Sequence, residues 1–506
     1  MLKTNTKAIK YIVYYVLSIQ LTIAIVFADT DLYQKVIVNN ISRKQIVILT
    51  QIGCIIDQVH HNSAIIHIPV HKISILDNMK LYYRVLPHNR HKKSIYGYPS
   101  LEEINKTLQS FQTDFPSICQ LYYIGNSYEK RPLYFIKISD NVALEEDEPE
   151  VKYIASMHGD EPIGAMLCLN LIDDLLHNYQ KDKFISKLVN DLEIWIMPLM
   201  NPDGYVHEQR FNRQGIDLNR NFPDRVKDNN NSTKGRAIEV QHVMNWEFAH
   251  SSVLSVNFHS GAALVNYPYD SDFNPNAEYS ASPDDDLFRE MSLSYAKYNP
   301  TIYNSTEFDL GITNGVAWYQ VNGGMQDWSY VWMGCMEVTV ELYDIKWPAF
   351  SQISQLWNEN RDAMLNYFIW AKKGIRGIIT DSLTGKPVLA SVQVEGNDFK
   401  VYTDPDVGDY HRILLPGAYN LFISADGYMT KHLTDIQVTD DYALRLDIEL
   451  MPLLNTSLSV IIHMLKVLSN NSETDMINFY DINHDNQNSL SDIIGAMQLI
   501  AHSNDN

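Results

Sequence analysis

The sequence predicts an α/β domain with a mixed, mostly parallel sheet and helices on both faces, accompanied by smaller modules. Three observations support this prediction. Between about residues 96 and 372, apolar strand-like runs alternate with amphipathic helical runs, which favours a sheet covered on both faces. The 506 residues are enough for about three domains. A composition of 45% hydrophobic and 20% charged residues is typical of globular proteins and not of disordered chains.

The formal net charge of −21 narrows the classes of partner. An acidic surface repels phosphate backbones, and the chain has no polybasic stripe, so we expect no nucleic-acid partner. Cationic peptides and divalent metals are the partners that this charge favours.

Residues 1–28 have the composition of a secretory signal peptide. Three lysines precede a mostly apolar run at residues 11–27, and Ala28 ends the segment. We therefore expect a secreted protein, extracellular or periplasmic, with no stable membrane insertion after signal cleavage. The apolar run is long for a signal peptide, so an uncleaved membrane anchor is the alternative.

The four cysteines leave the redox state open. An oxidising compartment would allow up to two disulfides, and free thiols are the other reading. The sequence alone does not choose a pairing for these residues: Cys54, Cys119, Cys168 and Cys335.

Residues 29–93 predict a small α+β module at the N-terminus. Short β-branched runs at 35–38, 45–50 and 64–68 alternate with polar joints, and the module ends in the basic stretch 90–93. Six histidines invite a metal-binding interpretation, but no carboxylate or cysteine accompanies them at a ligand-like spacing. They are His60, His61, His67, His71, His88 and His91.

The central region, residues 96–372, carries the predicted sheet. Residues 153–157 and 192–197 are strand-like, whereas 164–176 and 239–249 have helical spacing. In such sheets, functional sites form beyond the carboxyl ends of the strands. Chemistry is therefore expected in the segments that directly follow these strands.

Two further modules follow. Residues 374–452 contain short strands separated by turn signals, which predicts a small β-sandwich. In the tail, residues 453–506, the pattern of 457–462 returns at 489–494, which predicts two related helices.

A candidate metal site combines residues that follow two different strands. His158 and Glu161 are three residues apart after the strand at 153–157, and His259 follows a second apolar run. The first pair alone is a weak signal, because a glutamate at a helix start is common. Two histidines and a glutamate together are the ligands of a catalytic zinc site with an open position for water.

Further motifs occur in order around these residues: Asn201-Pro-Asp-Gly204, Asp217-Leu-Asn-Arg-Asn-Phe-Pro223, Gly323-Gly-Met-Gln-Asp327 and Glu337-Val-Thr-Val-Glu341. The set resembles the M14 zinc carboxypeptidases, and the second and third motifs resemble the regulatory branch that includes carboxypeptidases N, E, M and D. The resemblance covers about residues 96–372 and continues into the β-sandwich, which is similar to the transthyretin-like domain of that branch. It implies a carboxypeptidase-like fold.

The resemblance implies roles for the residues that match these motifs. His158, Glu161 and His259 become the zinc ligands, and Asp160 stays outside the ligand set. Glu341 becomes the general base that takes a proton from the attacking water.

Substrate contacts are implied in the same way. Arg210 matches the oxyanion-stabilising arginine, with Arg213 as a nearby competitor. Asn219 and Arg220 resemble the pair that holds the terminal carboxylate, and Tyr319 the tyrosine that closes over the bound residue. The remaining two matches, Asp270 and Gln326, are positions where the branch lines its pocket for a C-terminal Lys or Arg.

One departure from the branch lies beside a ligand. After His259 the chain has Ser-Gly-Ala, where the branch commonly has Gly-Gly. The shape of the neighbouring pocket therefore stays open at this point.

The tail carries a second candidate site. Oxygen-bearing side chains recur at calcium-loop spacing ahead of a helix, which resembles a dockerin or EF-hand-like loop. A capped loop without calcium is the alternative. The first repeat has no ligand set, so binding to a cohesin scaffold and a local stabilising role both stay open. The calcium ligands implied are Asp481, Asn483, Asp485, Gln487 and Asp492.

These inferences predict a secreted zinc metallocarboxypeptidase that acts on peptide or protein C-termini and releases Lys or Arg. Its N-terminal module is expected to act as a propeptide that chaperones or covers the active site and is cleaved around residues 90–93. One alternative is an M14-type hydrolase of peptidoglycan stem peptides, because diaminopimelate also carries a cation. Another is a calcium-dependent binding module with an inert hydrolase fold, although a binding module would not need the base Glu341.

Overall fold

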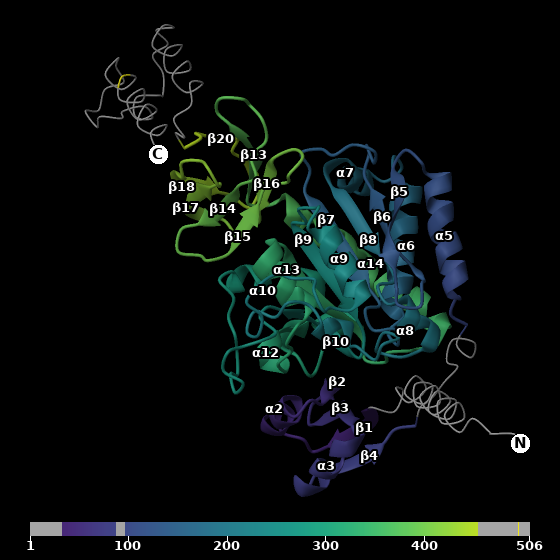
Figure 1. The fold of residues 1–506 in the computed structure, drawn as a ribbon. Coiled ribbons are helices and arrows are strands. Elements are labelled where there is room, and N and C mark those ends of the chain that lie inside the picture. Colours follow the sequence, from purple (N-terminus) through teal and green to yellow (C-terminus); the bar gives the residue numbers. More distant parts are fainter. Residues whose placement is uncertain (1–32, 88–96, 454–493, 495–506) are drawn as a thin grey trace, which may run out of the picture. The chain divides into compact units, whose positions relative to one another are not determined.

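The computed structural model describes residues 33–87, 97–453 and Ile494 (Figure 1). The predicted signal peptide, the basic stretch at 90–93 and the predicted calcium loop lie outside the described residues. The chain divides into two compact units: the first runs to Lys373 and also includes Ile413–Leu415, and the second contains the remainder from Gly374 onward.

The N-terminal module of the first unit is a four-stranded antiparallel sheet with short helices. The strand order is β2-β3-β1-β4. The β-branched runs at 35–38 and 64–68 lie within β1 and β3. The elements are β1 (Tyr33–Asn39), α2 (Arg43–Gln51), β2 (Ile55–His60), β3 (Ser63–Pro69), η1 (Val70–Lys72), α3 (Ser74–Asn78) and β4 (Tyr82–Val85).

The β-branched run at 45–50 is helical and belongs to α2. Ser42 and Gln45 form a capping box, in which each side chain bonds the other residue's backbone amide and so starts a helix. Ile46 and Leu49 are three residues apart and both buried, which is the spacing of one helix face. The capping signal and this spacing outweigh the β-branched composition of the run.

The rest of the first unit is built on an eight-stranded sheet of order β11-β10-β12-β9-β7-β8-β6-β5. The four strands β12, β9, β7 and β8 are parallel to one another, and β10 and β11 also pair in parallel. The pairs β10–β12, β6–β8 and β5–β6 are antiparallel. The sheet is therefore mixed with a parallel centre. The strands are β5 (Cys119–Asn126), β6 (Pro132–Ile138), β7 (Glu150–Ala155), β8 (Glu193–Met197), β9 (Leu254–His259), β10 (Ala262–Tyr267), β11 (Ile312–Asn314) and β12 (Met336–Tyr343).

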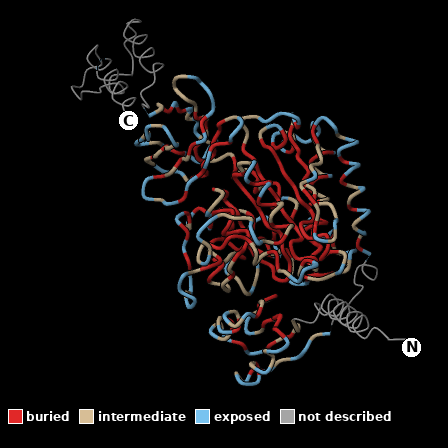
Figure 2. The backbone as a smooth tube through the Cα atoms, viewed as in Figure 1, coloured by how far each residue is buried: buried red, intermediate tan, exposed pale blue. Residues whose placement is uncertain are grey.

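Helices cover both faces of this sheet, as predicted, and successive residues of β7 show why. The Tyr153 ring stacks on Phe368, beyond α14, and its hydroxyl donates to the Met364 carbonyl at 2.7 Å. Ile154, on the opposite face, joins an apolar cluster formed with α9 and α13. The central strands are accordingly buried along their length (Figure 2). The helices are α5 (Leu101–Asp114), α6 (Ile163–Asn178), α7 (Lys183–Asp191), α8 (Pro202–His207), α9 (Ile238–Glu247), α10 (Asp285–Lys297), α11 (Pro300–Tyr303), α12 (Gly315–Trp318), α13 (Met325–Met333) and α14 (Ile353–Tyr367), with 3-10 turns η2 (Leu218–Arg220), η3 (Asp309–Gly311), η4 (Phe350–Gln352) and η5 (Phe368–Lys372).

The parallel centre brings the predicted site residues to one edge of the sheet. His158 follows β7, and His259 is the last residue of β9. In the register of β12 against β9, Glu341 lies opposite His259. Three segments that are far apart in the sequence therefore meet at the carboxyl ends of neighbouring strands, where such sheets form their sites.

The second unit is a pair of four-stranded sheets, which confirms the predicted β-sandwich strands. One sheet has the order β16-β13-β19 with β20 also on β13, and the other has the order β15-β14-β17-β18. The strands are β13 (Ile375–Asp381), β14 (Ser391–Val394), β15 (Lys400–Tyr402), β16 (Asp409–Arg412), β17 (Gly417–Ser424), β18 (Lys431–Val438), β19 (Leu444–Arg445) and β20 (Ile448–Leu450).

The four cysteines are buried free thiols, so the second of the two predicted alternatives holds in this structure. Within the described ranges, no helix combines the length and the apolar character needed to cross a membrane.

Candidate active site

The candidate ligands converge on one point. The Nδ1 atoms of His158 and His259 lie 3.1 Å apart, and each lies about as close to a different oxygen of Glu161, at 3.0 and 2.9 Å respectively. All three side chains are buried. These atoms form one of the few groups of metal-ligating side chains within the described residues.

The group on the far side of the His158 imidazole shows which nitrogen of that ring faces the other ligands. His158 Nε2 lies 3.1 Å from Asp217, and Asn219 Nδ2 lies 3.3 Å from His259 Nε2. A carboxylate partner assigns the proton of His158 to Nε2 and leaves a lone pair on Nδ1. Burial is the main cause that lowers the pKa of His259 to about 4, so this ring is neutral.

This donor set fits a zinc ion. Two imidazole nitrogens and the two oxygens of a carboxylate converge within about 3 Å of one another, which suits a shared metal cation. Two histidines and one glutamate are also the ligands of catalytic zinc sites that keep a position open for water.

Local sequence explains how the segment that carries His158 is held against α8. A Cβ on Gly159 would lie 1.9 Å from the backbone of Gly204, so only glycine fits after His158. Asn201 caps α8 by accepting from the Gly204 amide at 2.8 Å. Its side-chain amide also donates to the Met157 carbonyl at 3.2 Å, which ties the end of β7 to α8.

Glu341 lies beside the ligands with a free carboxylate oxygen. Its Oε2 is buried and has no hydrogen-bond partner. Burial, followed by the charge of Glu161, raises the pKa of Glu341 well above its ordinary value. A carboxylate with this environment is suited to accept a proton near neutral pH.

Arg210 lies in the site, whereas Arg213 does not. Arg210 is buried, with its guanidinium 3.1 Å from His158 Nδ1 and 2.9 Å from Asp217. Arg213 instead pairs with Glu129 at 2.8 Å, on an exposed part of the chain. Of the two candidates, only Arg210 can reach a substrate bound at the metal ligands.

The predicted carboxylate clamp lines the same cavity. Asn219 and Arg220 lie on η2, which Asp217 caps by accepting from the Asn219 amide at 3.0 Å. Tyr319 follows α12 and lines the cavity as well. The free volume of the cavity is about 30 Å³, enough for about one water molecule.

A buried carboxylate closes the far end of the cavity. Asp270 Oδ1 accepts from Asn266 Nδ2 at 2.8 Å and from Gln326 Nε2 at 3.2 Å. Burial, followed by the charge of Asp327, raises the pKa of Asp270 well above its ordinary value. The charge of Arg220 acts to lower the pKa of Asp270 but does not offset this rise. The carbonyl oxygens of the Asn266 and Gln326 amides are buried without a partner. Two unpaired amide oxygens and a carboxylate therefore lie together at this part of the cavity.

The N-terminal module also reaches into the cavity. Asp57, on β2, places Oδ1 3.1 Å from Arg210 and 2.5 Å from Lys346 Nζ. Lys346 in turn donates to Glu161 Oε1 at 2.6 Å. Burial acts to raise the pKa of Asp57, but the attraction of Lys346, Lys35 and Arg210 outweighs it and holds this pKa well below its usual range.

A second contact of the module involves α2. The Arg43 guanidinium donates to the carbonyls of Ala317 at 2.6 Å and of Ala277 at 2.7 Å, and also to that of Val316. The apolar core of the module packs against Trp318 and Tyr319. The module thus contacts both the ligand end of the cavity and the segment that carries Tyr319.

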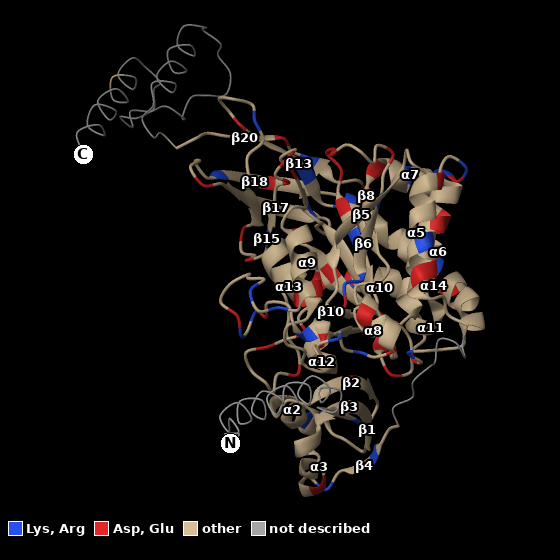
Figure 3. Ribbon diagram, turned by 45° about the vertical axis from the view of Figure 1, so that its right-hand side comes forward, with Lys and Arg blue, Asp and Glu red and all other residues tan. Residues whose placement is uncertain are grey.

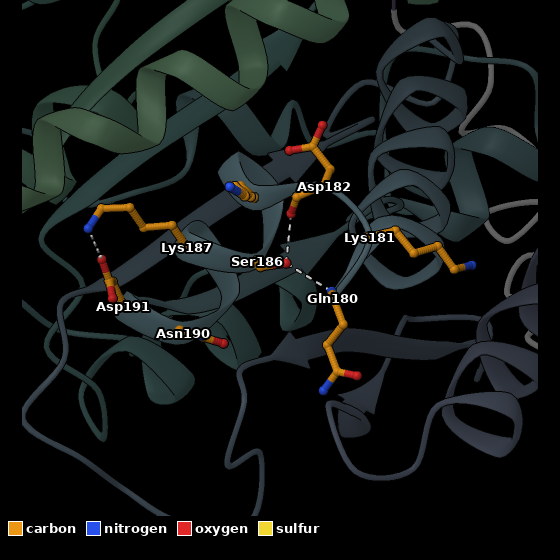
Figure 4. Close-up of a pocket in the computed structure, with 8 residues that line it drawn as sticks. Gln180, Lys181, Asp182, Ser186, Lys187, Asn190 and Asp191 are labelled. Carbon is orange, nitrogen blue, oxygen red and sulfur yellow. Dashed lines mark hydrogen bonds and ion pairs between the residues drawn. The ribbon is translucent and has the colours of Figure 1, made fainter.

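A larger hollow elsewhere lacks these features. It measures about 370 Å³ and surrounds the start of α7 (Figure 4). Its polar groups bond to one another, as in the pair Lys187–Asp191 at 3.5 Å, and the side chains of Gln180 and Lys181 point apart. Acidic residues are distributed over many elements of the ribbon (Figure 3), so charge alone does not mark a site.

Four residues of the site were not assigned from the sequence: Asp57, Asp217, Asn266 and Lys346. Asp217 opens a quoted motif, and Asn266 precedes Asp270 by four residues, so both carried a usable signal. Asp57 and Lys346 are 289 residues apart and belong to no shared motif. Only the folded chain brings this pair together.

We expect the chain to bind one zinc ion through His158, Glu161 and His259. Loss of a partner that only orients a ligand already costs about 10- to 100-fold in metal affinity. The variant Glu161→Gln should therefore bind zinc more than about 100-fold more weakly, as measured by competition with a chromogenic chelator. The neighbouring variant Asp160→Asn is the control and should retain zinc; equal affinities for both variants would contradict the assignment.

The geometry defines a mononuclear metal site with a buried base and a carboxylate-lined pocket, which is the arrangement of a metal-dependent hydrolase. Residues 104–363 match the family described as zinc carboxypeptidase, and residues 374–451 match the carboxypeptidase regulatory-like domain. The chain belongs to the M14 zinc carboxypeptidase family.

Several characterised proteins are similar to the chain. Carboxypeptidase SOL1 of Arabidopsis thaliana is 38% identical over 354 residues, which cover 69% of this chain and 72% of that protein. Carboxypeptidase M of Mus musculus is 36% identical, with coverage of 66% and 80%. Carboxypeptidase D of Homo sapiens is 39% identical over 70% of this chain, but the chain spans only about a quarter of its length, 26%.

Solved structures confirm the carboxypeptidase-like fold. Carboxypeptidase A from Helicoverpa armigera has a TM-score of 0.55 at 19% identity, and the match covers 67% of this chain and 97% of that one. Thrombin activatable fibrinolysis inhibitor has a TM-score of 0.51 at 19% identity, with coverage of 67% and 98%.

Proposed function

We propose that the chain is a secreted zinc metallocarboxypeptidase that releases Lys or Arg from the C-termini of peptides and proteins. The observation that carries this proposal is the convergence of His158, Glu161 and His259 beside the free carboxylate oxygen of Glu341. Family membership supports the same reaction.

A zinc ion held by His158, Glu161 and His259 would activate water and polarise the scissile carbonyl. Glu341 takes the proton of the attacking water at Oε2 and passes it to the leaving amine. Arg210, with a guanidinium fixed by Asp217, donates to the oxygen on which negative charge develops. The donors of Asn219 and Arg220 hold the terminal carboxylate, which limits cleavage to the last peptide bond.

The pocket around Asp270 supports a preference for a basic side chain. A guanidinium or ammonium group would pair with Asp270 and donate to the free carbonyl oxygens of Asn266 and Gln326. An apolar side chain would leave these three buried acceptors unpaired, which is unfavourable. Diaminopimelate also carries a cation, so stem-peptide hydrolysis is an alternative that a release assay must separate.

The N-terminal module supports a latent precursor. Asp57 occupies the guanidinium of Arg210, and Arg43 bonds to carbonyls of the segment before Tyr319. While the module is in place, Asp57 takes one donor of Arg210 and lies where the upstream part of a substrate would have to bind. We infer that cleavage between this module and the catalytic domain releases the enzyme. Tests of activity therefore use a cleaved chain, in which an inserted site for a specific protease within residues 88–96 has been cut.

We expect Asp270→Asn to change specificity in the cleaved chain. Without its counter-charge, the pocket should lose about 10- to 100-fold in kcat/KM for a substrate ending in Arg. A substrate ending in Phe should react as before, because it makes no use of the charge. The control is Asp286→Asn, an exposed carboxylate outside the pocket, which should change neither rate.

The ratio of the two rates decides this prediction. An equal loss on the Arg and Phe substrates would mean that Asp270 supports the fold of the loop and does not select the side chain.

Two parts of the proposal rest on composition and spacing alone, because their residues lie outside the described ranges. Secretion rests on the signal-like segment at residues 1–28. Calcium binding rests on the oxygen spacing in residues 481–492, and scaffold binding through that tail rests on the same resemblance.

A further inference from the structure

We propose that Lys346 and Arg210 form an anion subsite that binds an acidic side chain at one of the two residues before the scissile bond. The enzyme would then prefer substrates with Asp or Glu upstream of their C-terminal basic residue. This inference rests on the proposed carboxypeptidase activity and names a further determinant of its substrate.

The carboxylate of Asp57 marks the subsite in the structure. Its Oδ1 lies 3.1 Å from Arg210 and 2.5 Å from Lys346 Nζ, and the exposed fractions of the three side chains are 0%, 3% and 9%. Both cations belong to the catalytic domain, so both stay in place when the module leaves. Two buried donors that converge on one carboxylate oxygen form a built site for an anion.

The position of Lys346 assigns the subsite to the upstream part of the substrate. In the proposed reaction, the last residue of a substrate binds between Asn219, which contacts His259, and Asp270, and both residues line the cavity. Lys346 contacts Glu161, the third candidate ligand. The last residue of the substrate fills the side of the metal site that carries Asn219. The preceding residues therefore extend from the metal ligands toward Arg210 and Lys346.

The module itself follows this path. Gln58, the residue after Asp57 on β2, donates to the carbonyl of Gly261 at 3.0 Å, and Gly261 follows His259 by two residues. Residues 57 and 58 therefore place a carboxylate and a hydrogen bond to the Gly261 backbone along the path that the upstream residues of a substrate would follow. Asp57 thus stands in for an acidic residue of the substrate.

Departure of Asp57 leaves Arg210 and Lys346 with fewer direct anionic partners. Arg210 keeps Asp217 as a partner at 2.9 Å when the module leaves. Lys346 keeps Glu161, whose carboxylate is also a candidate metal ligand, and the more distant Asp160 at 4.0 Å. Departure of Asp57 therefore removes a direct anionic partner from both cations. An acidic side chain restores that partner, whereas an alanine does not.

The test compares three blocked tripeptides: Ala-Ala-Arg, Ala-Asp-Arg and Asp-Ala-Arg. The protein is the cleaved chain carrying Asp57→Ala, so that the module's own carboxylate does not compete. At least one acidic peptide should show a kcat/KM that is about 10-fold or more above that of Ala-Ala-Arg. Lys346→Met should abolish the preference, Lys346→Arg should retain it, and the exposed control Lys106→Met should leave it unchanged.

A second readout does not depend on turnover. In the same chain with Glu341→Gln, calorimetric titration should show tighter binding of the preferred acidic peptide than of Ala-Ala-Arg, and Lys346→Met should remove the difference. Equal kcat/KM for the three peptides, or a preference that survives Lys346→Met, would overturn the inference while leaving the proposed activity intact. Failure to release Arg from any of them would overturn the proposed function, and this inference with it.

Discussion

The cleaved chain carrying Glu341→Gln should lose about 100- to 10,000-fold in kcat, since a positioned general base contributes a factor of this size. Gln has nearly the same shape as Glu but cannot accept the proton of the attacking water. KM should change little, because the clamp and the pocket around Asp270 are untouched. The measurement is the rate of Arg release from a blocked dipeptide under saturating conditions.

Zinc content provides the control for this variant. Glu341 is not one of the converging ligands, so Glu341→Gln should bind zinc as tightly as the parent chain. A variant that retains zinc and more than about a tenth of the parent kcat would contradict the role of Glu341 as the base.

The uncleaved chain carrying Asp57→Ala should be far more active than the uncleaved parent. Removing one partner from a buried ion pair costs about 3 to 5 kcal/mol, which corresponds to at least about 100-fold in the population with an open site. We therefore expect the basal rate of Arg release to rise by about 100-fold or until it reaches the rate of the cleaved chain.

Two comparisons test whether the effect is specific to the carboxylate of Asp57. Asp77→Ala removes an exposed carboxylate from the same module and should leave the uncleaved chain latent. Asp57→Ala should change the rate of the cleaved chain much less than that of the uncleaved one. An uncleaved parent that is already as active as the cleaved chain would show that the module does not restrain the enzyme.

The sequence predicted those parts of the fold and site that depend on local patterns. The alternation of strands and helices predicted the mixed sheet, and the positions after its strands predicted that His158 and His259 would meet. Glu341 was predicted from a motif, and the register of β12 against β9 brings it beside His259. Local order along the chain was sufficient for these predictions.

Contacts between distant segments could not be predicted in this way. Asp57, Arg210 and Lys346 meet only because the N-terminal module packs over the carboxyl end of the sheet. The composition of the run at 45–50 does not by itself show that it forms α2, which begins at the capping box of Ser42 and Gln45. Burial in the folded protein, which decides the pKa of Asp270 and leaves Asn266 with a free acceptor, is also not visible in a motif.

The most direct test of the account is amino-acid release by the cleaved chain from a matched set of blocked dipeptides and stem peptides ending in Arg, Lys, Phe, Glu or diaminopimelate. We predict release of Arg and Lys that both a zinc chelator and Glu341→Gln abolish. Release of diaminopimelate alone would contradict the proposed substrate and move it to the cell wall. A zinc-loaded, cleaved chain that releases nothing would contradict the enzyme itself and favour a binding module.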